Sequence, residues 1–218
     1  EAIKDDAPRI YPNVPNNIGA RHGGHRGGDV DAAFADAKWT IKEVIHSPRM
    51  AAIPMEGRAV AAQPDPVHGL TVWTSTQAPH TNRNSIADAL GLSQAKVRVI
   101  APEVGQKIGP YYEDFLVAAA AHKLRQPVKW IETRSENILA SSHGRNQIAE
   151  VEAAMAEDGK ITALRCRVLL DAGAWPKGLD LGNSTFIMAT GCYDIPAIDY
   201  EVLSIYTNTG ANGAYRGA

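Results

Sequence analysis

Alternating apolar and polar residues predict β-strands along much of the chain. In WTIKEVIH, at 39–46, every second side chain would lie on the same face of a sheet. The run VRVIAPEV, at 97–104, is rich in β-branched residues and predicts a buried strand. Four more segments of strand character are 56–63, 70–76, 127–133 and 200–208. The region 145–172 predicts a hairpin, because two strand-like runs flank EDGK, an Asp-Gly turn signal.

Helical spacing appears in three places. Asp29 is a suitable cap for a short helix over 30–38, and Gly91 is a suitable end for a helix over 80–91. The third predicted helix spans 111–124. Its apolar face is expected to comprise Phe115, Leu116, Ala119, Ala120 and Leu124.

These elements predict an α+β fold, with mixed sheets and helices packed on one face. Residues 1–28 carry three prolines and five glycines without a clear period, so we expect an extended lead-in there. Residues 29–218 are then expected to form one domain-sized piece. The chain begins without Met and stops in a glycine-rich turn, so we expect a piece of a longer protein.

Composition narrows the function classes. A net charge of −2 gives no electrostatic reason to expect nucleic acid or an anionic membrane as a partner. No apolar run approaches the roughly 18–20 residues of a membrane span. Cys166 and Cys192 are isolated, which indicates buried thiols in a reducing, cytoplasmic setting rather than a disulfide framework.

Hydrolase and metal chemistry have weak candidates. His22 and His25 are close in sequence but lack a third ligand at metal spacing, so a solvated loop explains them better. Ser142 and His143 are adjacent, but no G-x-S-x-G motif accompanies them, and a chance dipeptide explains them better. A hydrolase based on this pair remains a minor hypothesis.

The acidic and amide side chains leave more alternatives open. Glu113 and Asp114 begin a predicted helix, where carboxylates suit the positive end of the helix dipole. Glu56 lies between apolar runs, so we expect it to be partly buried, either in a salt bridge or in a site. Gln77 could cap a turn, or its amide could hydrogen-bond an oxo or amide group. Arg216, in GAYRGA, has small neighbours that would let a ligand approach the backbone.

The stretch PEVGQKIGP, at 102–110, lies between a predicted strand and a predicted helix. Such turns often hold phosphates or cofactors when glycines bring the backbone close to the ligand. Here Gly105 and Gly109 enclose three larger residues. The pattern by itself does not distinguish a binding loop, an altered binding loop and a simple turn.

Several motifs in order resemble one family. They are PMEGRAVAA (54–62), LTVWTSTQAPH (70–80), VRVIAPEVG (97–105), PVKWIETRSENILASSHGR (127–145), GCYDIPA (191–197) and YTNTGANGAYRGA (206–218). Together they resemble the molybdenum-cofactor-binding subunit of the molybdenum hydroxylases. This group includes xanthine dehydrogenase, aldehyde oxidase and, in particular, the large subunit of aerobic carbon monoxide dehydrogenase. The resemblance covers the chain from about residue 13 to the end.

The resemblance implies roles for particular residues. Gln77 matches the glutamine that hydrogen-bonds an oxo ligand of molybdenum in the family. Tyr215 is part of the segment that lines the substrate side of the metal. The implied cofactor-binding residues are Gln77, Gly105, Lys107, Ile108, Gly109, Arg216 and Gly217. In the family, a substrate is hydroxylated with water as the oxygen source, and electrons leave through iron–sulfur clusters and usually FAD.

Two departures from the family pattern limit what this chain can do. Gln106, Lys107 and Ile108 replace the usual glycines and phenylalanine, which should block or reshape the loop. The family's general-base glutamate lies further along the subunit than residue 218. The chain by itself is therefore expected to be inactive and not to bind molybdopterin stably.

The expected partners are the rest of the large subunit and iron–sulfur and FAD subunits, with self-association through exposed sheet edges as a further possibility. The alternative is a remnant or interaction module that keeps the fold without the cofactor. The sequence does not choose among an aldehyde, an N-heterocycle or purine, and carbon monoxide as substrate.

Overall fold

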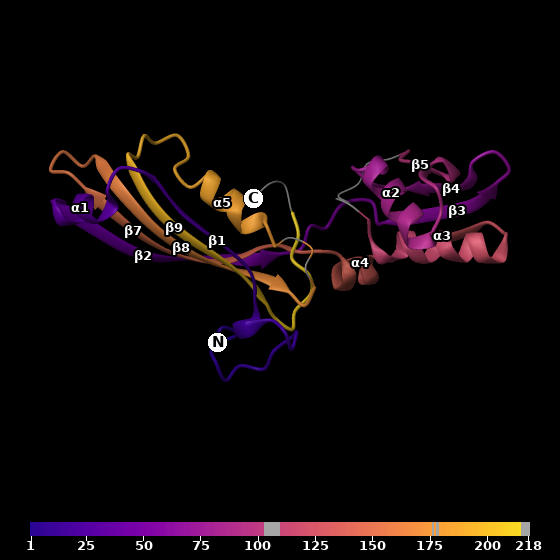
Figure 1. The fold of residues 1–218 in the computed structure, drawn as a ribbon, viewed down its shortest axis with the longest axis horizontal. Helices are drawn as coiled ribbons and strands as arrows, with labels where there is room; N and C mark the ends of the chain where they lie inside the picture. The colour runs from indigo at the N-terminus through magenta and orange to yellow at the C-terminus, as the bar shows by residue number, and fades with distance from the viewer. Residues whose placement is uncertain (103–109, 176, 178, 215–218) are drawn as a thin grey trace. The chain divides into compact units, whose positions relative to one another are not determined.

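The structure is a computed structural model that describes residues 1–102, 110–175, 177 and 179–214. The chain divides into two compact units (Figure 1). Unit 1 comprises Glu1–Ala51 and Ser141–Ala218, and unit 2 comprises Ala52–Ala140. In the sequence, unit 2 is thus inserted between the two segments that form unit 1.

Unit 1 contains a five-stranded mixed sheet with the order β1-β9-β8-β7-β2. The strands are β1 (Ile18–Gly27), β2 (Trp39–Met50), β7 (Gly144–Met155), β8 (Ile161–Gly173) and β9 (Ala197–Tyr206). Strands β8 and β9 are parallel, and the other neighbours are antiparallel. Strands β7 and β8 form the predicted hairpin, and Gly159 adopts a φ of +82° in its turn. A side chain would be strained in this backbone conformation, so the glycine suits the turn.

Two helices of unit 1 pack on opposite faces of this sheet. Helix α1 (Val30–Ala35) begins as predicted at Asp29, whose side chain accepts a hydrogen bond from Ala32 N at 3.0 Å. It packs against a cluster that includes Ala197 of β9. Helix α5 (Leu181–Ile187) lies against Val202, because a Cβ on Gly182 would approach Val202 within 2.3 Å. Residues 197 and 202 are five positions apart on β9, so their side chains project from opposite faces of the sheet.

Unit 2 has a four-stranded mixed sheet with the order β5-β4-β3-β6. Its elements are β3 (Ala59–Asp65), β4 (Gly69–Thr74), α2 (Pro79–Leu90), the short 3-10 helix η2 (Gln94–Lys96), β5 (Val97–Ile100), α3 (Tyr112–Leu124), β6 (Val128–Ile131) and α4 (Arg134–Ala140). Strands β4 and β5 are parallel. Helix α2 ends at Gly91, which has a φ of +63°, as its sequence predicts.

The core of unit 2 lies between this sheet and helices α2 and α3. Buried side chains from β3, β4 and β5 meet those of both helices in one cluster; they include Val60, Ala62, Leu70, Val72, Ile86, Ala87, Val97, Val117, Ala118 and Ala121. Helices α2 and α3 of unit 2 therefore cover the same face, as predicted, whereas α1 and α5 of unit 1 depart from this prediction by lying on opposite faces of their sheet. The α+β class with mixed sheets is confirmed.

The predicted apolar face of α3 is wrong. Its buried residues are Asp114, Val117, Ala118 and Ala121, whereas Leu116 and Leu124 are 67% and 62% exposed. The sequence of this helix is apolar almost all the way round, so helical spacing does not select one face. The buried carboxylate of Asp114 marks the inner face instead.

The N-terminal residues form more structure than an extended lead-in. Residues 18–27 are strand β1, which pairs with β9 along nearly its whole length. The 3-10 helix η1 (Pro15–Asn17) precedes it. Buried Asn17 donates to the carbonyls of Ala2 and Pro8 and accepts from Ile10 N, which holds the first residues in place. Helices α4 and α5 are two further elements without a predicted counterpart.

The cysteines only partly match the expectation of buried thiols. Cys166 is half-buried in the sheet of unit 1, and this burial raises the pKa of its thiol. Cys192 is exposed, so the expectation is wrong there, because it lies in a turn after α5 rather than in a strand. None of the helices formed by the described residues is long and apolar enough to cross a membrane.

Candidate functional site

Of the seven residues implied to bind the cofactor, Gln77 falls within the described part of the chain. The other six, Gly105, Lys107, Ile108, Gly109, Arg216 and Gly217, lie outside the described residues. Their proposed roles therefore stay predictions. The geometry around Gln77 is the part of the candidate site that can be built from contacts.

Gln77 stands between the end of β4 and the start of α2. Its side chain is exposed, whereas the neighbouring Thr74 and Thr76 are buried. Thr76 Oγ1 accepts a hydrogen bond from Ala78 N at 3.1 Å, which closes a tight turn around Gln77. The exposed amide of Gln77 thus lies in a short segment in which Thr74 and Thr76 are buried.

Asp114 ties this segment to the rest of unit 2. Its side chain is completely buried, and Thr74 Oγ1 donates to Asp114 Oδ1 at 2.7 Å. Asp114 Oδ2 accepts from Tyr111 N at 2.9 Å and from Asn82 Nδ2 at 3.4 Å. One carboxylate therefore joins the end of β4, helix α2 and the first turn of α3. The sequence predicted only a helix-dipole role for Asp114, because partners this distant are not visible in a linear pattern.

A second buried cluster surrounds Arg58. Glu132 accepts hydrogen bonds from Arg58 Nε at 2.8 Å and Arg58 N at 2.9 Å, and Asn137 Nδ2 donates to it at 2.7 Å. Glu113 Oε2 lies 3.1 Å from Arg58 Nη1. The guanidinium also lies over the ring of Tyr111, 4.2 Å from its centroid. This cluster connects the start of β3, the end of β6 and helices α3 and α4.

These contacts explain the ionisation of the cluster and correct one expectation. Burial by itself would raise the pKa of Glu132, but the hydrogen bonds from Arg58 and Asn137 bring it below its ordinary value. Glu56 was expected to be partly buried, and this is wrong, because its side chain is exposed. The buried member of the PMEGR motif is Arg58, whose acidic partners are distant in sequence.

The segment 207–213 leads toward Arg216 and is anchored by Asp171. Thr207 Oγ1 donates to Asp171 Oδ1 at 2.6 Å, and Arg49 Nη2 donates to Asp171 Oδ2 at 2.9 Å. The buried Asn212 donates to the carbonyl of Asp171 at 2.8 Å. Burial by itself would raise the pKa of Asp171, but the bonds from Thr207, Gly173 N and Arg49 lower it.

A row of charges crosses all five strands of unit 1. Lys42, Glu152, Arg165, Asp199 and His25 lie side by side in register. Lys42 Nζ lies 2.6 Å from Glu152 Oε1, and His25 Nδ1 lies 2.7 Å from Asp199 Oδ1. The row lies beside a shallow groove of about 380 Å³. Its opposite charges alternate and neutralise one another, so the groove does not select a ligand of one charge.

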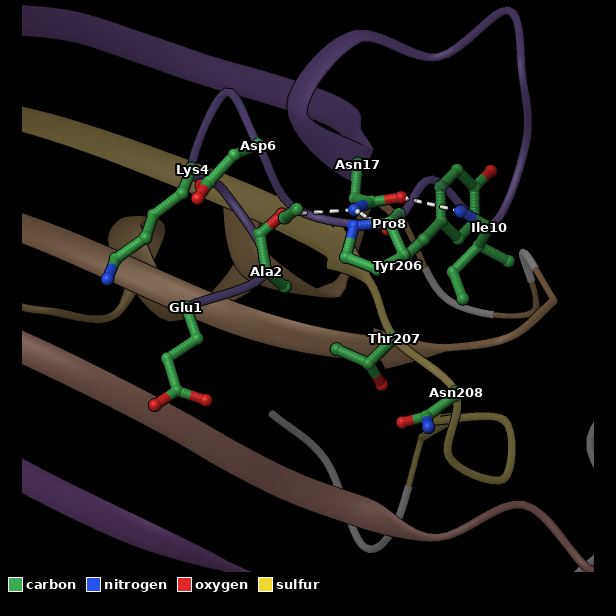
Figure 2. Close-up of a pocket in the computed structure, with 11 residues that line it drawn as sticks. Glu1, Ala2, Lys4, Asp6, Pro8, Ile10, Asn17, Tyr206, Thr207 and Asn208 are labelled. Carbon is green, nitrogen blue, oxygen red and sulfur yellow. Dashed lines mark hydrogen bonds between the residues drawn. The ribbon is translucent and has the colours of Figure 1, made fainter.

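A larger cavity, of about 440 Å³, lies in unit 1 between residues 1–10 and 206–208 (Figure 2). Figure 2 shows Asn17 hydrogen-bonded to the segment that covers it. Lys4, Glu1 and Asp6 contribute mixed charges to the lining. The polar groups of Asn17 bond to the protein itself, so the contacts do not indicate a ligand class.

The remaining candidate residues lie in unit 1. His143 N donates to Ala211 O at 3.0 Å, and Gly213 N donates to His143 O at 2.7 Å, which places residues 141–143 beside the segment 207–213. His22 lies near Asp180, whereas His25 pairs with Asp199. Within the described ranges, no group of three or more His, Cys, Asp or Glu residues could hold a metal ion.

Comparisons with known proteins identify similarity to one family. The family model described as the molybdopterin cofactor-binding domain matches residues 10–218. The nicotine 6-hydroxylase large subunit of Paenarthrobacter nicotinovorans is 36% identical, over 93% of this chain and 26% of its own length. The carbon monoxide dehydrogenase large chain of Afipia carboxidovorans is 33% identical, over 99% of this chain and 29% of its own.

Solved structures of known enzymes have the same fold as this chain. A carbon monoxide dehydrogenase from Oligotropha carboxidovorans superimposes with a TM-score of 0.87 at 31% identity, over 98% of this chain and 29% of that one. An aldehyde oxidoreductase from Desulfovibrio gigas shares the fold, with a TM-score of 0.85 at 21% identity. The chain thus spans 24–29% of the length of these relatives.

Proposed function

The chain belongs to the family of molybdopterin cofactor-binding domains, and we propose that it is part of the large subunit of a molybdenum hydroxylase. In this proposal the complete enzyme oxidises an aldehyde, an N-heterocycle or carbon monoxide, with water as the oxygen source. The observation that carries the proposal is the position of Gln77, an exposed amide on a segment fixed by buried neighbours, at the motif position where the family binds its cofactor.

The residues around Gln77 fit such a group. An oxo ligand requires hydrogen-bond donors, and the carboxamide of Gln77 supplies N–H donors without adding charge. The twelve-residue helix α2 begins two residues later at Pro79 and has no side-chain cap, so the backbone N–H groups that follow Pro79 in its first turn add positive potential. Both features suit an electron-rich ligand.

The proposed contribution of this chain is to bind and orient. Bound molybdopterin supplies the redox chemistry, a two-electron oxidation of the substrate. Gln77 would hold the cofactor by a hydrogen bond, and the resemblance implies that Tyr215, Arg216 and Gly217, which lie outside the described residues, would line the substrate side. The Asp171 contacts fix residues 207–213, so that this segment is ordered before substrate arrives. The general base is proposed to come from another part of the large subunit.

The activity is proposed to depend on an assembly. The remaining part of the large subunit would complete the cofactor site, and iron–sulfur and FAD subunits would carry the electrons away. A relative of 34% identity is described as subunit gamma of the 6-hydroxypseudooxynicotine dehydrogenase complex of Paenarthrobacter nicotinovorans, which agrees with a multi-subunit arrangement.

A second function has one observation in its favour. Gln106, Lys107 and Ile108 stand where the family resemblance leads us to expect glycines and phenylalanine. Long side chains there would keep the backbone N–H groups from a ligand. The alternative proposal is therefore a non-catalytic module that keeps the fold without the cofactor.

Metal analysis separates the two proposals. We expect the chain purified by itself to hold far less than one molybdenum per chain, and the large subunit assembled with its partners to hold about one. A Gln77→Ala variant of the assembly should lose molybdenum or activity, whereas His80→Ala, exposed in the first turn of α2, should not. Absence of molybdenum from the full assembly would favour the non-catalytic module. Stoichiometric molybdenum in the isolated chain would contradict the expected dependence on assembly.

A further inference from the structure

We infer that Asp114 is a positioning residue for Gln77. The inference rests on the proposed function, because it concerns the same site. The inference does not come from the family resemblance, because none of the motifs that carry the resemblance includes Asp114. It follows from where the buried hydrogen bonds of unit 2 converge.

Gln77 is bracketed in sequence by two side chains that bind the same carboxylate. Thr74, three residues before it, donates to Asp114 Oδ1 at 2.7 Å. Asn82, five residues after it, donates to Asp114 Oδ2 at 3.4 Å. Both donors are buried, at 2% and 0% exposure. The segment that contains Gln77 is therefore bonded at both ends to the carboxylate of Asp114 in helix α3.

The anchor itself is rigidly placed. Asp114 Oδ2 also accepts from Tyr111 N at 2.9 Å, so the carboxylate is held by the first turn of its own helix α3. The side chain has no exposure to solvent. Water cannot replace a lost partner there without entering the core, which makes these bonds selective for one arrangement of the segment.

Between the two anchored ends, the turn is short and internally bonded. Asn82 N donates to Ala78 O at 3.0 Å, and Ala78 N donates to Thr76 Oγ1 at 3.1 Å. Few backbone torsions remain free between Thr74 and α2. We therefore expect a shift at Thr74 to move the backbone of Gln77, whose side chain is exposed.

The sharpest test changes one hydroxyl. Thr74→Val removes the donor to Asp114 at nearly constant volume, and Thr74→Ser restores it. Thr71→Val is the matched control, because Thr71 is also buried in β4 and its hydroxyl donates to a different carboxylate, Asp65, at 2.9 Å. The readout is amide hydrogen exchange in the chain of residues 1–218, which requires no cofactor.

We expect Thr74→Val to speed exchange at the Ala78 and Asn82 amides, which both donate hydrogen bonds in this turn, by about 10-fold or more, with little change at Thr74→Ser or Thr71→Val. Unchanged exchange at both amides in Thr74→Val would overturn the inference. Equal acceleration in Thr71→Val would also overturn it, because the effect would then be general loosening of β4.

Asp114→Asn provides a second, independent variant. A carboxamide has one oxygen in place of two, so at least one of the three donors loses its acceptor. In the cofactor-loaded assembly we expect Thr74→Val and Asp114→Asn to lower kcat more than they raise KM, with Thr74→Ser close to the original protein. If the assembly binds no molybdenum, the proposed function fails while the exchange measurement still decides the inference. If the assembly is active and the exchange is unchanged, the inference fails while the function holds.

Discussion

Arg58 and Glu132 form an ion pair that is almost completely withdrawn from solvent. Their side chains are 7% and 0% exposed, and Arg58 Nε donates to Glu132 Oε1 at 2.8 Å. Arg58 comes just before β3 and Glu132 just after β6, so the pair joins two neighbouring strands beyond their last paired residues. A charged pair at this position can only be stable while both members are present.

Removing one member should therefore destabilise unit 2 strongly. We expect Glu132→Gln to lower the free energy of unfolding by about 3 kcal/mol, because it leaves the Arg58 charge buried with weaker compensation. Chemical denaturation followed by tryptophan fluorescence, to which Trp73 and Trp130 contribute from unit 2, would measure the change. Glu56→Gln is the control, and as an exposed substitution it should change stability by less than about 0.5 kcal/mol. Equal effects of the two substitutions would contradict the assigned pairing.

Asp171 should make the stability of unit 1 sensitive to acid. Its pKa lies below the ordinary value of 3.8, so its contribution to stability is present above the unfolded pKa and is lost as pH falls through the folded pKa. Thr207→Val removes a hydrogen bond to the carboxylate, which raises the folded pKa and should move acid unfolding to higher pH. Thr162→Val, whose hydroxyl bonds only to the Ala154 carbonyl in the described contacts, should not. Circular dichroism across an acid titration distinguishes these outcomes.

His25 should titrate above its ordinary pKa of 6.5. The hydrogen bond to Asp199 and the contact of Nε2 with the Gly27 carbonyl, at 3.0 Å, both favour the charged ring. Any stabilisation from this pair is present below pH 6.5 and is lost as pH rises through the folded pKa. In an NMR titration, Asp199→Asn should bring the His25 pKa down toward 6.5. Asp180 lies near His22 instead, so Asp180→Asn should leave the pKa of His25 unchanged.

The free edge of β2 should promote self-association. Strand β2 ends the order of the described sheet, and Trp39, Ile41 and Ile45 project from one face at 57%, 48% and 57% exposure. Burying one isoleucine is worth about 1.5–3 kcal/mol, so Ile41→Lys should weaken association by at least about 10-fold. Sedimentation measures this, with Val67→Lys, at an exposed turn, as the control. A monomer at high concentration in the original protein would contradict the expectation.

Local signals in the sequence predicted those elements that local chemistry determines. The β7–β8 hairpin follows from its Asp-Gly turn, helix α1 from its Asp29 cap and the end of α2 from Gly91. Each of these depends on residues only a few positions apart. The mixed α+β class follows from the order in which such elements occur.

Features that depend on distant partners were not predictable in this way. Strand β1 is rich in glycine and becomes a strand because β9, about 180 residues later, supplies its hydrogen bonds. The buried face of α3 is set by the partners of Asp114, not by the spacing of its leucines. For the candidate site, the motif identified Gln77, but the carboxylate that fixes its segment lies 37 positions further on.

The insertion of unit 2 between β2 and β7 also imposes an order of events during synthesis. Strands β1 and β2 leave the ribosome early, yet their only neighbours in the described sheet, β9 and β7, follow after the whole of unit 2. Unit 2 can complete its own core first, because all its strands pair with one another. The first strands must meanwhile remain unpaired, with the apolar side chains of β2 exposed. We therefore expect the nascent chain to be most prone to aggregation in the interval before β7 and β9 are synthesised.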